Sequence, residues 1–361
     1  MNVNGGMLRL GRQRKGFQQG EAAERLGVAQ ANLSRAENGI VVPSDDLIDR
    51  AVKVYELPRS FFFQPDTVYG APVSVHPMWR RKADVTLNDM DRIVAELNLR
   101  VMHTKRLLEA AEIAQVFDIP RLDIEEYGDP EKIAALLRAH WKVPSGPVQD
   151  LTKLVEQAGA IVIHSPLAGP SVSGVTFAVP GMPPLIVLNH EQPADRLRFT
   201  LAHELGHLVM HRFPTPNMED EANAFAGAFL MPATDIRPYF SGRNIDFALL
   251  AALKPEWKVA MQALLMRARA LKVVSPNQER YLWQQFNMRR MKLREPPELD
   301  FPKEVPSTIS EIIRLHMGTL QYEMKDLETL LHMYAREIPN FYNFTDGMTP
   351  RGASHLRLVK E

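Results

Sequence analysis

The sequence of 361 residues contains no cysteine. This absence excludes disulfide bonds and thiolate zinc sites, so any metal would have to be held by histidine and carboxylate side chains. No apolar run reaches the roughly 18 residues that suggest a membrane-spanning helix. The N-terminal stretch MLRLGRQRKGFQQGE turns polar at once, unlike a secretory signal peptide. Together these absences predict a cytoplasmic protein with no membrane partner.

An excess of charge of either sign is also missing, since 43 Lys and Arg balance 43 Asp and Glu. Binding to nucleic acid would therefore have to come from a local patch rather than from the field of the whole molecule. The apolar content of 45% and the charged content of 24% are ordinary for a globular protein. The length allows about two or three domains.

Proline and glycine positions, read with the hydrophobic periodicity, divide the chain into predicted elements. A cluster of short helices is expected over 8–63 and longer helices over 86–117 and 129–142. The middle of the chain reads as a helix near 148–158, a strand at 160–164 and a hairpin-like pair at 173–180 and 184–189. Helices follow at 194–211 and 218–230, and the pattern beyond 247 is mainly helical.

The stretch RFTLAHELGHLVMH, residues 198–211, places His203 and His207 four residues apart, with Glu204 directly after the first histidine. Residues i and i+4 lie on one face of a helix, so both imidazoles can bind a single metal ion. Glu204 is rotated by about 100° and can take a proton from a metal-bound water. The alternative is a buried apolar helix whose histidines are satisfied without a metal.

A third ligand is expected from the next helix, NMEDEANAFAGAFLMP, residues 217–232. Glu219 and Asn223 share a face at i and i+4, so Glu219 can complete a set of three ligands that leaves the fourth position open. Asn223 would then orient a ligand histidine through its other ring nitrogen. Asp220 and Glu221 are weaker candidates for the ligand. The alternative is that these acidic residues serve only to complement the helix dipole.

These two stretches resemble the ImmA/IrrE family of zinc-dependent metallo-endopeptidases. The family pattern H-E-x-x-H, then E-x-x-A-N-x-F-A, then L-M-P is met at His203, Glu204, His207, Glu219 and Asn223. The resemblance covers roughly residues 75–240. It implies a cytoplasmic zinc protease of bacterial or phage origin that cuts a specific regulatory protein, usually a repressor or an antitoxin.

The chemistry expected of such a site begins with Zn²⁺, which lowers the pKa of its bound water towards about 7. Glu204 would accept the proton and later pass it to the leaving amine. His211 and Tyr239 are possible donors to the oxyanion, although His211 is more simply a histidine at a helix end. The strand PLIVLN (184–189) could bind an extended peptide along its edge, unless it is paired on both sides.

The N-terminal stretch FQQGEAAERLGVAQANLSRAENG, residues 17–39, has the pattern of a helix-turn-helix. A positioning helix over 18–26, a turn at Gly27 and a recognition helix over 29–37 are expected. Leu33 and Ala36 would face inward. The polar residues expected to reach bases or phosphates are Gln19, Gln30, Asn32, Ser34 and Arg35.

This stretch resembles the Xre/Cro-type DNA-binding domain. Ala22 departs from the family pattern, which usually has leucine there, whereas Arg9, Arg12, Arg14 and Lys15 on the first helix favour phosphate contact. The alternative is a domain kept for protein interaction or dimerisation. The matching positions are Gln19, Glu21, Ala23, Leu26, Gly27, Val28, Ser34, Glu37, Gly39 and Pro43.

The expected fold is therefore a multi-domain, mainly α protein. It consists of a five-helix helix-turn-helix domain (1–68), a helical linker or entry segment (69–145), an α+β zincin-like peptidase core with a small sheet (146–240) and a helical C-terminal domain without an assigned role (241–361). The expected partners are a double-stranded DNA operator, a regulatory protein substrate and a second copy of the chain in a homodimer. The alternative is a regulator or antitoxin whose zincin domain senses a metal or a partner without efficient proteolysis.

Overall fold

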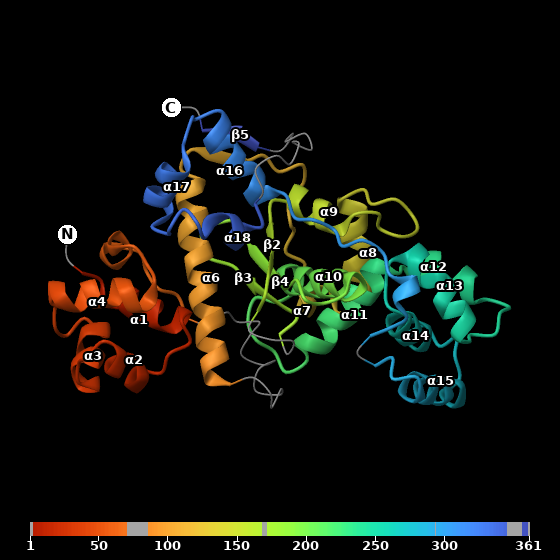
Figure 1. Cartoon of the computed structure of the whole chain (residues 1–361). Coiled ribbons are helices and arrows are strands. Elements are labelled where there is room, and N and C mark those ends of the chain that lie inside the picture. The colour runs from red at the N-terminus through yellow and green to blue at the C-terminus, as the bar shows by residue number, and fades with distance from the viewer. Residues whose placement is uncertain (1–2, 71–85, 168–171, 293, 345–355, 360–361) are drawn as a thin grey trace.

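A computed structural model describes residues 3–70, 86–167, 172–292, 294–344 and 356–359. In this part of the chain helices dominate, and two small sheets accompany them (Figure 1). The predicted multi-domain, mainly α class is confirmed. No helix within the described ranges combines the length and the apolar character that a membrane crossing requires.

The N-terminal domain contains the five expected helices around one core. Gly5 allows α1 and α3 to approach closely, because a Cβ at this position would lie 2.2 Å from the carbonyl oxygen of Ala36. Leu33 and Ala36 on α3 are buried, as predicted. The helices are α1 (Gly5–Arg14), α2 (Gln19–Arg25), α3 (Gln30–Glu37), α4 (Asp45–Tyr55) and the 3-10 helix η1 (Arg59–Phe63).

The long helix α6 (Leu87–Leu107) lies between this domain and the rest of the molecule (Figure 1). On one side, Leu99 and Met102 join the core of the N-terminal domain. On another, Leu97 and Val101 join the core that contains the three-stranded sheet. One helix thus contributes to two hydrophobic cores.

The sheet consists of β2 (Ile161–Ser165), β3 (Gly174–Phe177) and β4 (Leu185–Asn189) in the order β2-β4-β3. β3 and β4 are antiparallel, which confirms the predicted hairpin-like pair, and β2 runs parallel to β4. β4 is therefore paired along both edges and is fully buried. The suggestion that β4 offers an edge to a peptide is wrong, and β3 is the outer strand next to the helix of the H-E-x-x-H motif.

One face of the sheet packs on a large helical core that includes the motif helix. Val162, Ile186 and Leu188 contribute to this core from the strands. The helices are α7 (Ile124–Tyr127), α8 (Pro130–His140), α9 (Leu151–Gln157), α10 (Ala194–Met210), α11 (Met218–Leu230), α12 (Ala233–Phe240), α13 (Phe247–Trp257), α14 (Met261–Ala270) and α15 (Pro276–Met288).

The last helices return to the opposite face of the sheet and pack beside α6 (Figure 1). Residues 241–344 are consequently shared between two cores, since α13 to α15 belong to the first and α16 to α18 to the second. The domain boundaries proposed from the sequence stay a prediction. The remaining elements are η2 (Pro297–Leu299), α16 (Thr308–Gly318), α17 (Met324–Leu331), α18 (Ile338–Tyr342) and the antiparallel pair β1 (Ala111–Ile113) and β5 (Leu356–Leu358).

A reciprocal pair of carboxylates fastens this returning segment to the sheet domain. The Glu304 carboxylate accepts the backbone N–H groups of Leu151 and Thr152 at the start of α9. Glu156 near the end of α9 accepts the N–H groups of Ser307 and Thr308 at the start of α16. Each helix thus has its free N-terminal donors satisfied by a residue of the other segment.

Candidate metal centre and DNA-binding helix

Helices α10 and α11 bring together the three side chains that the motif predicts as ligands. His203 and His207 lie one turn apart on α10 with their Nε2 atoms 3.0 Å apart. Glu219, in the first turn of α11, places its two carboxylate oxygens 3.5 Å from Nε2 of His203 and 3.4 Å from Nε2 of His207. Among the described residues these three form the one cluster able to hold a metal.

The spacing of these atoms fits a tetrahedral zinc site. Ligand bonds of about 2.0–2.1 Å at tetrahedral angles separate two ligand atoms by roughly 3.3 Å, and the observed separations lie on either side of this value. Oε1 of Glu219 is buried and has no hydrogen-bond partner. A buried carboxylate oxygen left in this way is costly unless a cation is present. The donor set therefore fits Zn²⁺ held by His203, His207 and Glu219.

Asn223 supports His203 from behind, as the sequence predicts. Its Oδ1 lies 3.0 Å from Nδ1 of His203. An amide oxygen can only accept, so the imidazole proton belongs on Nδ1 and Nε2 keeps its lone pair for a metal. This contact is the one that the predicted orienting role of Asn223 requires.

His207 is supported by a longer chain of hydrogen bonds. Its Nδ1 lies 3.0 Å from Nδ1 of His211, whose Nε2 lies 3.0 Å from Oε2 of Glu221. If Nε2–H of His211 donates to Glu221, then Nδ1 of His211 accepts from His207 and Nε2 of His207 also presents a lone pair. Two lone pairs facing each other at 3.0 Å repel unless a proton or a cation lies between them.

His211 and Tyr239, the two suggested oxyanion donors, are placed differently. His211 contacts the rear nitrogen of His207 and is almost fully buried there. This position favours the orientation of His207 over contact with a substrate. The Tyr239 hydroxyl on α12 donates to Glu256 at 2.6 Å and its ring packs on Trp257. No described contact brings Tyr239 to the histidines.

The electrostatics of the cluster favour charge on the carboxylate. Burial raises the pKa of Glu219, but the adjacent imidazoles of His203 and His207 outweigh burial and lower this pKa to about 2. Burial lowers the pKa of His203, and the neighbouring Glu219 and Glu204 more than reverse this effect. Glu219 is thus ionised throughout the neutral range, as a metal ligand must be.

Glu204 has a partner that the sequence reading missed. The Thr176 hydroxyl on β3 donates to Oε2 of Glu204 at 2.7 Å, and both residues are buried. The hydrogen bond fixes one oxygen of the carboxylate and leaves the other for a proton. The sequence shows only that Thr176 is a polar residue in the otherwise apolar strand GVTF, which does not indicate that its partner is Glu204.

Close packing holds α10 against α11. Gly206 faces Phe225 of α11, and a Cβ at residue 206 would lie 2.9 Å from Cδ1 of that buried ring. Because residue 206 has no side chain, α10, which carries His203 and His207, can pack closely against α11, which carries Glu219.

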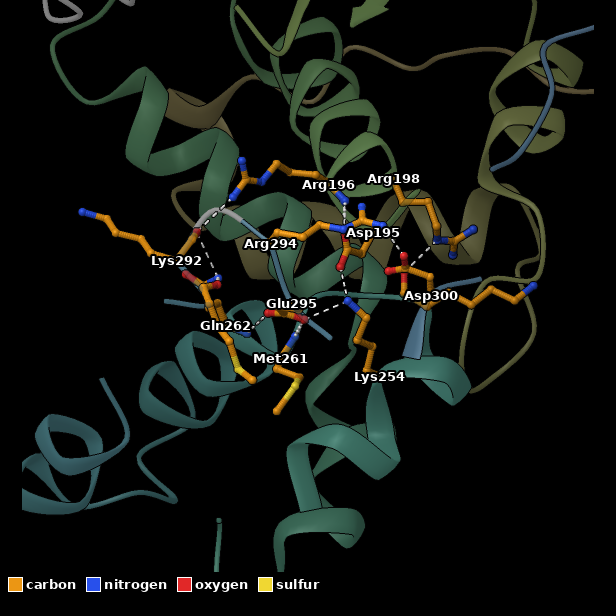
Figure 2. A network of polar contacts seen from close by, with 12 residues as sticks. Asp195, Arg196, Arg198, Lys254, Met261, Gln262, Lys292, Arg294, Glu295 and Asp300 are labelled. Atoms are coloured by element: carbon orange, nitrogen blue, oxygen red, sulfur yellow. Dashed lines mark hydrogen bonds and ion pairs between the residues drawn. The ribbon is translucent and has the colours of Figure 1, made fainter. Parts of the chain in front are cut away.

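A buried ionic cluster fixes the start of α10. Figure 2 shows the Lys254 ammonium of α13 between the carboxylates of Asp195, in the first turn of α10, and Glu295. The two carboxylates raise the pKa of Lys254 despite its burial, which acts to lower it. Glu295 also accepts the N–H groups of Met261 and Gln262 at the start of α14. The helix that carries the histidines is thereby tied to the helices that follow it.

The predicted recognition helix, α3, presents most of the residues expected to contact DNA. Gln30, Asn32 and Arg35 are exposed, whereas Ser34 is half-buried. Gln19 is half-buried on α2, and its amide donates to Glu37 at 3.0 Å, so it also braces the two helices against each other.

The first helix departs from the expected phosphate-binding role. Arg12 is buried and forms an ion pair with Glu37 of α3. Arg14 pairs with Glu337 near α18, and Lys15 pairs with Glu56. The interpretation as a phosphate patch is therefore wrong for the buried Arg12, whereas for the partly exposed Arg14 and Lys15 phosphate contact stays a prediction that competes with these ion pairs.

Comparison with protein-family models supports both parts of the chain. Residues 155–269 match the model of the IrrE N-terminal-like domain, the M78 family of peptidases. Residues 5–60 match a helix-turn-helix domain. A search of curated proteins finds no significant match. The first matched range contains the whole metal cluster, and the second contains α1 to α4.

Proposed function

We propose that this chain, which joins a helix-turn-helix domain to an IrrE N-terminal-like peptidase domain, is a DNA-binding regulator with a zinc-dependent endopeptidase activity. It would cleave one specific regulatory protein, a repressor or an antitoxin. The observation that supports the proposal is the position of Glu204, which follows His203 on α10 beside the cluster of His203, His207 and Glu219 and accepts a hydrogen bond from Thr176. A site that only stores a metal needs no such base.

The residues of the chain suggest a division of labour in peptide hydrolysis. When bound, zinc supplies Lewis-acid activation of the water and of the scissile carbonyl. Glu204 accepts a proton from the attacking water and returns it to the leaving amine. Thr176 holds the carboxylate in position, while Asn223 and His211 fix the two imidazole rings.

The outer strand β3 offers a way to hold the substrate backbone. Among the described residues β3 pairs only with β4, and Thr176 on this strand contacts Glu204. A peptide that extends the sheet beside β3 would pass close to the base and the ligands.

The alternative is a sensor that binds a metal or a partner without efficient proteolysis. The ligand set and its supporting hydrogen bonds fit this role equally well. A sensor does not require the hydrogen bond between Thr176 and Glu204, and for this reason we favour the peptidase.

The test compares wild type with Glu204→Gln, using Glu191→Gln as a control at an exposed carboxylate near the start of α10. Each variant is analysed for bound zinc and is co-expressed with regulators encoded by neighbouring genes. We expect all three proteins to retain zinc and only Glu204→Gln to lose cleavage, by about 100-fold or more. If wild type leaves every candidate regulator intact, the sensor is the better description.

The DNA-binding role is tested with Arg35→Ala on α3 and Lys53→Ala on α4. Both residues are exposed, and both substitutions remove one positive charge. Arg35→Ala should weaken binding to the operator upstream of the gene by about tenfold, and Lys53→Ala should change it little. Equal effects in a gel-shift titration would argue against α3 as the recognition helix. Binding of two copies per palindromic site would support the expected homodimer.

A further inference from the structure

A pocket unrelated to the metal centre lies where four parts of the molecule meet. Its volume is about 500 Å³, a size typical of sites for small molecules. The walls come from α1 (Arg14), from α6 (Glu96 and Arg100), from the end of β2 (His164 and Ser165) and from the segment around α18. In Figure 1, α18 lies beside α6 and β2.

The pocket and Glu204 contact different outer strands of the same sheet, the pocket β2 and Glu204 β3. Thr176 of β3 is in register with Ile186 of β4, which is in register with Val162 of β2. Ser165, at the far end of β2, lines the pocket. A ligand here would therefore not occupy the peptidase site.

Positive charge exceeds negative charge in the walls. The carboxylate of Glu96 pairs with Arg100, and that of Glu337 pairs with Arg14. Both acids are thus already neutralised. Arg336 in the same pocket has no ion pair among the described residues.

A smaller hollow shares Arg14, Glu96 and Phe341 with this pocket and adds Arg92. Arg92 also lacks an ion pair in the part of the chain that the structure describes. Together the walls therefore carry an excess of two positive charges.

Apolar surface accompanies these charges. Phe341 and Pro166 line the pocket, and the Arg100 guanidinium stacks on the Phe341 ring at 4.1 Å. Arg100 also donates to the Phe341 carbonyl at 3.1 Å, which fixes this wall. The chemistry matches an anionic group attached to an apolar body.

We propose that this pocket binds a small organic anion, a phosphate or carboxylate on an apolar body, through Arg336 and Arg14. To reach Arg14 the ligand must displace Glu337, because the two side chains are 2.7 Å apart. Arg14 belongs to the helix-turn-helix domain and Glu337 to the segment beside the sheet. Occupancy thus exchanges a contact between two parts of the protein for a contact with the ligand.

The experiment uses the full chain and isothermal titration with phenyl phosphate, benzoate and benzamide. Benzamide has nearly the shape of benzoate without its charge, and the two anions distinguish phosphate from carboxylate. We expect saturable binding of at least one anion below about 10 mM and none of benzamide. Absence of saturation by both anions, or equal binding of benzamide, overturns the proposal.

Two variants should change the affinity of that anion in opposite directions. Arg336→Gln should weaken it by about tenfold, since it removes one charge-assisted contact. Glu337→Gln should tighten it several-fold, since it frees Arg14 from its competitor. The controls Arg280→Gln and Glu109→Gln make the same charge changes at exposed positions outside the pocket and should have little effect. If the test and control variants change the affinity for the anion equally, the effect comes from the overall charge of the protein, and the proposed site is rejected.

Discussion

Two glycines of the α10–α11 pair differ in their surroundings. Gly206 on α10 faces the buried ring of Phe225, whereas a Cβ at Gly227 on α11 would meet nothing within 4 Å. Both lie inside helices, where alanine is more favourable than glycine by about 1 kcal/mol. Steric surroundings alone should therefore decide the effect of substitution.

We predict that Gly206→Ala destabilises the protein and weakens zinc binding. Overpacking a close contact costs about 1–3 kcal/mol, which exceeds the helix-propensity gain of about 1 kcal/mol. Separation of α10 from α11 also moves Glu219 away from the histidines. Gly227→Ala should instead raise the unfolding free energy by about 0.5–1 kcal/mol. Urea unfolding and zinc titration measure both effects, and a stabilised Gly206→Ala would contradict this account.

At this scale the sequence predicted which side chains come together when the residues lie close in the chain; their roles at the site stay a prediction. His203, His207, Glu219 and Asn223 follow from helical periodicity within 21 residues, together with a resemblance carried by the same residues. Thr176 was missed because its partner Glu204 lies 28 residues away on another type of element. Pairing across a sheet and a helix depends on tertiary packing, which no local period encodes.

The pair α9 and α16 shows the same limit among elements. Both helices were recognisable from their periodicity, but their reciprocal capping joins residues about 150 positions apart. Hydrophobic patterns assign such a helix a buried face without specifying which surface covers it.

A pH effect follows from this capping. Burial raises the pKa of the Glu156 carboxyl to about 7, although hydrogen bonds from Ser307 and Thr308 oppose the rise. The folded protein therefore holds this proton more tightly than the unfolded chain. The stability that this group contributes is fully present below its unfolded pKa and is lost as the pH rises towards 7.

We predict that Glu156→Gln removes this part of the pH dependence. The midpoint of thermal unfolding, measured for both proteins from pH 4.5 to 7.5, should fall less steeply with pH in the variant. The unfolding midpoint of the variant, relative to that of wild type, should therefore increase as the pH rises. Glu109→Gln, at an exposed site in the turn after α6, should follow wild type. Parallel curves for Glu156→Gln and wild type would show that Glu156 titrates normally.

At the scale of the whole molecule, the last helices are part of the sheet domain and not an appendage. Ile312 and Leu327 are fully buried against the same core as Ile161 and Val187 of the sheet. The sequence predicted a helical C-terminal domain, and the structure specifies the far face of the sheet and α6 as the surface that these helices cover.

Removal of residues 306–361 should therefore damage the peptidase domain, although every predicted metal ligand is retained. The truncation exposes apolar side chains of β2, β4 and α6 and leaves Glu156 without the N–H groups that it accepts. We expect aggregation or rapid digestion by trypsin, together with reduced zinc content. A soluble 1–305 chain that binds zinc as wild type does would show that the segment is dispensable.

Helix α6 has a consequence for how the molecule works on an operator. Helix α6 supplies side chains to the core of the helix-turn-helix domain and to the core of the sheet. It therefore fixes the orientation of these two parts of the protein relative to each other. A copy seated on DNA would point its metal centre in a set direction from the duplex axis. On a palindrome, the second copy would point its centre along the direction related by the dyad. The spacing in base pairs between the operator and the binding site of a partner protein would then decide whether that partner can reach the metal centre.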